Sequence, residues 1–273
     1  MPIRERLQFE DVEGVRVGRV GWGLNTVFVV YRIGDVLIDT GPSNQWRPVR
    51  SFVSELPPRR LLLTHHHEDH SGNAARLAKL YDLLPEAPEA SRDKLRRGYR
   101  TPPMQRFIWG SPRRVEAAAL PERIDLPAGD PLIPIHTPGH SKDHHCLFRP
   151  ECRALFTGDL FLSRRLTHMR IDEDLAVLMQ SLADVLKLDF DVALCSHRGV
   201  AEDGRSAMAD KLAFLKQLCA DARRLHDDGV PEGDAVRRLL GPEDAVSHLS
   251  RYNISKRNLY RQAVQAADAA QPE

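Results

Sequence analysis

The chain lacks the features of several broad protein classes. It has only four cysteines and no CxxC pair, so a disulfide scaffold is not expected. No run approaches the ~18 uninterrupted apolar residues of a membrane helix, and no apolar stretch follows the charged N-terminal residues of a secretory signal. Lys and Arg total 39 against 38 Asp and Glu, which gives no bulk positive charge for coating nucleic acid. We therefore expect a cytoplasmic protein with reduced thiols and no membrane partner.

The 273 residues contain 42% apolar side chains, which is enough for a sizeable core. Short β-rich runs alternate with helical patterns up to about residue 200, which is typical of an α/β domain. From about Asp203 only helical signals remain: Met208, Leu212 and Leu215 begin one apolar stripe, and Ser255 is a candidate N-cap. We predict a catalytic domain at 1–202, with a proline-interrupted insertion at about 85–121, and a helical C-terminal domain at 203–273.

The residues Thr64–His70, with the sequence THHHEDH, concentrate potential metal ligands directly after an apolar strand. His65 and His67 are two residues apart, so on an extended segment they project the same way. Asp69 and His70 follow at the turn into the next helix. Three more candidates also follow strands: His140 in HTPGHS, Asp159 in FTGD and His197 in CSH. Imidazole with carboxylate suits zinc, iron or manganese.

These motifs, in this order, resemble those of the metallo-β-lactamase superfamily over roughly residues 15 to 200, and especially its hydroxyacylglutathione hydrolase-like, thioesterase-like branch. The resemblance implies a four-layer αβ/βα sandwich with the site at one edge. It also implies two divalent metal ions, with zinc as the first choice and iron or manganese as alternatives. The implied ligands are His65, His67 and His140 for one ion, Asp69, His70 and His197 for the other, and Asp159 as the bridge. Asp69 and His70 are also the implied catalytic residues. Asp39 in LIDTG matches a family position that orients a ligand imidazole. His144 also matches a family position, and it is expected to lie beside the ligands without binding metal.

Neighbouring histidines and acids receive different interpretations. Strand alternation points His66 away from the ligands, so it is expected to be exposed or to support them. Glu68 is expected to be a surface acid. His168 belongs to no metal motif and is expected to be solvated.

The segment from Arg92 to Arg114 is unusually basic, with eight basic residues against one acid, Asp93. Within it, Arg96, Arg97 and Arg100 are candidate contacts for an anionic substrate. Arg165 and His168 are candidates for another wall of the pocket. The alternative is a solvated segment that pairs with acids of the helical domain or of a second subunit in a homodimer.

The leading functional hypothesis is a dinuclear metal-dependent hydrolase, in which a metal-bridged hydroxide attacks a small anionic acyl thioester or related ester. The alternative enzyme is a phosphodiesterase or endoribonuclease that uses the same metals, with the basic segment contacting nucleic acid. The non-enzymatic alternative is a metal-binding regulatory protein of this fold.

Overall fold

The computed structural model describes residues 3–20 and 26–269, which form two compact units. Of these residues, the first unit comprises 3–20, 26–136, 143–162 and 189–204, and the second comprises 137–142, 163–188 and 205–269. Among the described residues, no helix is long and apolar enough to cross a membrane. All four cysteines are described, and none of them forms a disulfide.

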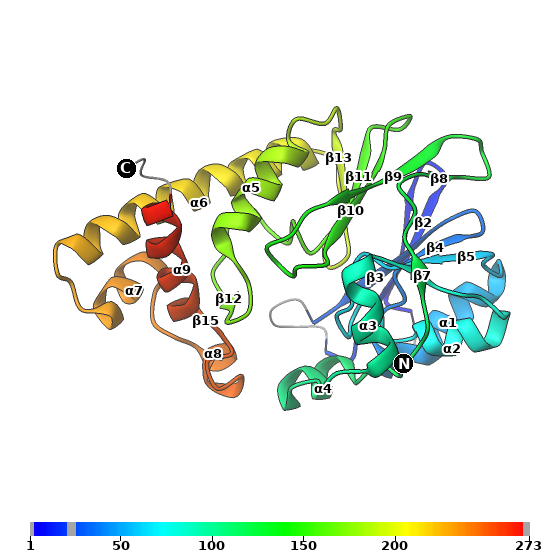
Figure 1. The fold of residues 1–273 in the computed structure, drawn as a ribbon, viewed down its shortest axis with the longest axis horizontal. Helices are drawn as coiled ribbons and strands as arrows, with labels where there is room; N and C mark the ends of the chain where they lie inside the picture. The colour runs from blue at the N-terminus through cyan, green and yellow to red at the C-terminus, as the bar shows by residue number, and fades with distance from the viewer. Residues whose placement is uncertain (1–2, 21–25, 270–273) are drawn as a thin grey trace. The chain divides into compact units, whose positions relative to one another are not determined.

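The first unit contains two β-sheets (Figure 1). The seven-stranded sheet follows the chain order: β1 (Glu5–Phe9), β2 (Val12–Val17), β3 (Phe28–Ile33), β4 (Val36–Ile38), β5 (Arg60–Leu62), β6 (Glu86–Ala87) and β7 (Ala118–Ala119). The six-stranded sheet has the order β14 (Gly199–Ala201), β13 (Val192–Cys195), β11 (Ala154–Gly158), β10 (His145–Arg149), β9 (Pro131–His136) and β8 (Ile124–Asp125).

Side-chain alternation along β3 explains how the sheets pack. Val29, Tyr31 and Ile33 join a buried cluster with residues of β10, β11 and β13, so they fill the core between the two sheets. Phe28 and Val30 point to the opposite face. There they join residues of the helices α1 (Trp46–Glu55), α2 (Ala74–Tyr81) and α3 (Glu89–Arg97). The expected α/β sandwich is therefore confirmed.

The segment predicted as an insertion, residues 85–121, is partly built into the first sheet. Its β6 and β7 are parallel strands that extend the sheet beyond β5. Between them lie α3 and α4 (Pro103–Trp109). The helix α3 packs on the core through Leu95. The basic residues of this segment are thus carried by a framework that the sheet anchors.

The second unit is mainly helical. It contains β12 (Met169–Arg170), β15 (Ile254–Ser255), α5 (Leu175–Val185), nearly all of α6 (Gly204–Asp227), α7 (Glu232–Leu240), α8 (Ala245–Leu249) and α9 (Lys256–Ala269). The predicted N-cap at Ser255 is confirmed, because its hydroxyl accepts the backbone N–H of Asn258. The helix α5 belongs to this unit although it precedes residue 203, so the linear division at 202/203 stays a proposal.

Candidate metal centre

Strand ends of both sheets present the candidate ligands of the first unit. The strand β5 ends at Leu62 and leads directly into the loop 64–70, while β4, its parallel neighbour, ends just before Asp39. In the second sheet, the parallel strands β11 and β13 end just before Asp159 and His197. Strand ends of a rigid sheet can hold such side chains in place. The following side chains are all buried: His65, His67, Asp69, His70, Asp159 and His197.

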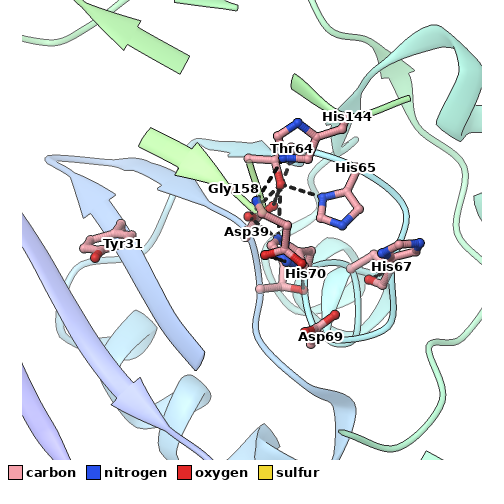
Figure 2. Close-up of polar contacts among 12 residues, drawn as sticks. Tyr31, Asp39, Thr64, His65, His67, Asp69, His70, His144 and Gly158 are labelled. Atoms are coloured by element: carbon pink, nitrogen blue, oxygen red, sulfur yellow. Dashed lines mark hydrogen bonds and ion pairs between the residues drawn. The ribbon is translucent and has the colours of Figure 1, made fainter. Parts of the chain in front are cut away.

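Within the first unit, potential ligand atoms converge in two overlapping groups. Those of His65, His70 and Asp159 all lie within 4.8 Å of one another, and so do those of Asp69, His70 and His197. One Asp159 oxygen is 3.2 Å from both His70 Nε2 and His197 Nε2. Figure 2 shows His65, His67, Asp69 and His70 around a single loop. The residues that the sequence assigned to the second ion and to the bridge therefore lie together.

Asp39 orients two of these imidazoles (Figure 2). Its carboxylate accepts the backbone N–H of Thr64 at 2.9 Å and the Nδ1–H of His70 at 2.7 Å. The Thr64 hydroxyl also donates to Asp39, at 2.9 Å, and is therefore left to accept the Nδ1–H of His65 at 3.1 Å. With Nδ1 protonated on both rings, Nε2 carries the lone pair that a metal needs.

Two further hydrogen bonds orient the residues from the second sheet. His197 donates Nδ1–H to the backbone oxygen of Val27 at 2.7 Å, which leaves its Nε2 facing the carboxylates. His144 is fully buried, and its Nε2 accepts the backbone N–H of Asp159 at 2.9 Å. Gly158 makes this approach possible, because a Cβ at that position would lie 2.4 Å from His144 Nε2.

The carboxylates place a strong negative field on the imidazoles. Burial by itself lowers the pKa of His70, but Asp39, Asp159 and Asp69 outweigh it and raise the pKa well above its ordinary value. Burial likewise lowers the pKa of His197, yet Asp159 and Asp69 raise it to about 10. A site that favours positive charge this strongly, and is built from oriented imidazoles and carboxylates, fits divalent transition metals.

His140 belongs to the second unit, where its Nδ1 contacts Glu173 at 2.5 Å. Its assignment as a third imidazole beside His65 and His67 stays a prediction. In the same unit, Arg165 is exposed and its guanidinium lies 5.9 Å from the Phe214 ring centroid. A role for Arg165 in substrate binding also stays a prediction.

His66 is buried, with an exposed fraction of 6%, so exposure is excluded and its role in supporting the ligands stays a prediction. Two expectations about neighbouring residues were wrong. Glu68 is buried, with an exposed fraction of 2%, although it was expected to be a surface acid. His168 is also buried, and its Nε2 contacts Asp244 at 3.0 Å. The sequence reasoning missed Asp143 altogether. This residue lies two positions after the HTPGHS motif, yet its carboxylate accepts hydrogen bonds from His66, which lies 77 residues earlier in the chain.

Several arginines of the basic segment are paired with nearby acids, which reduces the positive charge that the segment presents. Arg96 and Arg97, with side-chain exposures of 49% and 70%, both pair with Asp93 one helical turn earlier. Arg92 pairs with Glu89. Arg100 is exposed just beyond α3. These acids come from α3 itself, whereas the sequence alternative placed them in the helical domain or in another subunit.

Comparison with known proteins identifies the family. Residues 20–197 match the model of the metallo-beta-lactamase superfamily. An atrochrysone carboxyl ACP thioesterase of Passalora fulva is 31% identical over 198 residues, covering 70% of this chain and 53% of that protein. A lactamase-like protein of Emericella nidulans is 30% identical and covers 66% and 53%. The chain thus spans about half the length of these curated relatives.

Solved structures support the same fold. A beta-lactamase domain protein from Burkholderia ambifaria aligns with a TM-score of 0.75 over 98% of this chain and 91% of that one, at 17% identity. A metallo-beta-lactamase family protein from Thermus thermophilus aligns with a TM-score of 0.68 over 94% and 92%, at 18% identity. At these identities the likeness establishes the fold alone.

Proposed function

Because the chain belongs to the metallo-β-lactamase superfamily, we propose that it is a dinuclear metal-dependent hydrolase of acyl thioesters. The observation that carries this proposal is the buried convergence of imidazole and carboxylate atoms at the strand ends. Chains that keep the fold for regulation alone have no physical need to bury and orient such a set, because burying charged groups without a cation is costly.

We assign one ion to His65, His67 and His140 and the other to Asp69, His70 and His197, with Asp159 shared. The equal 3.2 Å distances from one Asp159 oxygen to His70 Nε2 and His197 Nε2 support the shared role. Zinc is the first choice, and iron and manganese suit the same ligands. When bound, such ions lower the pKa of water and polarise a carbonyl group.

The protein's own residues orient and confine the reaction. Asp39 and Thr64 hold the imidazoles so that Nε2 faces inward. Asp69 and His70 are the proposed catalytic pair, and they would hold the second ion together with His197. In the net reaction, the water oxygen bonds to the acyl carbon, the C–S bond breaks, and the leaving sulfur takes up a proton as a thiol.

The substrate class follows from the relatives and from α3. Curated relatives are named as ACP thioesterases, so we propose an acyl thioester carried on an acidic carrier protein, in place of a glutathione thioester. Arg100 is exposed, and Arg97 stays 70% exposed although it pairs with Asp93, so both guanidinium groups remain open to contact with such an acidic partner. A small anionic thioester or ester is the simpler substrate of the same site. A cytoplasmic location and a homodimer are part of this proposal.

A panel of substrates tests the proposal. Metal-loaded protein should hydrolyse acyl carrier protein thioesters and acyl-pantetheine, with free thiol released in step with acid. It should leave bis-p-nitrophenyl phosphate and short RNA intact. Asp159→Asn should abolish turnover and lower the metal content, whereas Asp130→Asn, in a buried ion pair with Arg149 that lies outside the predicted ligand set, should retain both. Diester cleavage without thioester turnover would replace the proposal with the nuclease alternative.

A further inference from the structure

Asp143 is a buried carboxylate with no place in the predicted ligand set. It lies just before β10, is 1% exposed and belongs to the first unit. Its Oδ2 accepts the backbone N–H of His66 at 2.9 Å and the hydroxyl of Ser91 at 2.5 Å. The Nδ1 of His66 lies 2.8 Å from the same oxygen and 3.0 Å from the other. One carboxylate thus joins the metal-ligand loop to α3, which carries Ser91.

His66 is held on its other sides by the basic segment. Since His66 Nδ1–H donates to Asp143, its Nε2 accepts an N–H of Lys94, whose Nζ lies 3.2 Å away. Tyr99, two residues after α3, donates its hydroxyl to the backbone oxygen of His66 at 2.7 Å. Its ring also packs on the His66 ring with centroids 5.1 Å apart.

This arrangement constrains the ligands because His66 lies between them in the chain. The chain bends at His66, so the backbone of this residue sets the direction in which both of its neighbours leave it. His65 and His67 are those neighbours, and the rings of His66 and His67 pack with centroids 4.7 Å apart. A shift of His66 therefore displaces both imidazoles, whose useful positions tolerate only about 0.5 Å of error.

We propose that Asp143 is a positioning residue that clamps the metal-ligand loop to α3 through His66. The loop 64–70 and α3 then move together, so that the orientation of His65 and His67 depends on helix α3. This inference rests on the proposed metal site, but the clamp itself concerns only side chains of the first unit. The role does not require Asp143 to touch either metal or substrate.

Zinc affinity of the folded protein tests the clamp, measured by competition with a chromophoric chelator. Loss of an orienting partner typically costs 10–100-fold in metal affinity, and we expect a loss in that range for Asp143→Ala. Asp143→Asn keeps the shape and one acceptor, so it should restore part of the affinity. Ser91→Ala removes one bond of the clamp and should cost less than either. The matched control is Asp130→Asn, which breaks the buried ion pair with Arg149 and should leave zinc affinity unchanged.

Hydrogen exchange gives a second readout that needs neither metal nor activity. In Asp143→Asn, amides of the loop 64–70 and of α3 should exchange faster together, whereas Asp130→Asn should change neither. Faster exchange in the loop alone, or unchanged zinc affinity in folded Asp143 variants, would overturn the clamp. If the wild-type protein bound no zinc, the proposed function would fail, and the paired exchange result would still decide the clamp.

Discussion

Asp39 allows a direct test of the metal centre, because one carboxylate orients two predicted ligand imidazoles. In Asp39→Asn, the side-chain oxygen can still accept the Thr64 backbone N–H, which is 2.9 Å from Oδ1 in the native protein. The amide N–H₂ then occupies the position of Oδ2, which in the native protein accepts the Nδ1–H of His70 at 2.7 Å. Two donors cannot face each other, so the His70 proton should move to Nε2 and remove the lone pair that binds metal.

The magnitude follows from the bonds that are lost. A lost orienting partner lowers metal affinity by 10–100-fold, which corresponds to about 1.4–2.7 kcal/mol of binding free energy. Losing one charged hydrogen bond should lower the free energy of unfolding by about 1.5–3 kcal/mol. The backbone adds little strain, because Asp39 has a φ of +56° and asparagine tolerates this left-handed conformation.

Chelator competition and elemental analysis measure the metal, and urea denaturation measures the fold. Asp35→Asn in the nearby β3–β4 turn is the control, because it neutralises a carboxylate whose partner, Arg59, is exposed at the surface. Thr64→Val should weaken zinc binding less, because it frees His65 but leaves His70 bonded to Asp39. Asp39→Asn protein that binds zinc as tightly as wild type would refute the orienting role.

Three other perturbations probe separate parts of the molecule. Gly158→Ala should lower the free energy of unfolding by about 2–4 kcal/mol, because φ is +47° at this position and the added Cβ would clash with His144. Thermal melting measures this change, and a loss below about 0.5 kcal/mol would contradict the close packing of Gly158 against His144. Glu243→Gln should destabilise α9 by about 1–2 kcal/mol, because the carboxylate accepts two backbone N–H groups at its start. Burial raises the pKa of Glu243, but these bonds and that from Ser247 outweigh it and lower the pKa. Its stabilising effect is therefore complete above about pH 4.3 and lost as the pH falls through the lowered pKa, so wild type and Glu243→Gln should converge in stability in acid. Replacing Arg97 and Arg100 with Gln should raise KM for a carrier-protein thioester about 2–10-fold and make that KM less dependent on salt concentration. The KM for acyl-pantetheine should not change, and equal effects on both substrates would argue against docking of the carrier protein on these arginines.

Local sequence was sufficient to propose the candidate ligands and to predict that the chain forms buried strands. The motif THHHEDH holds four candidate ligands within six residues, so no long-range contact is needed to recognise them. The continuous apolar run of residues 28–31 likewise indicates a buried strand, and β3 is buried along its whole length. The order of the motifs also identified the family, which the match over residues 20–197 confirms.

Tertiary structure decided which polar groups support those ligands. Alternation alone left His66 either exposed or in support of the ligands, because its partner Asp143 is 77 residues away and Lys94 lies on a helix whose place no local pattern specifies. The pairing of β6 with β5 and β7 could not be predicted from the sequence either, because two-residue strands are too short to show a periodic pattern. Burial, hydrogen-bond partners and proton positions depend on segments distant in sequence, since only folding brings those segments together and excludes water from between them.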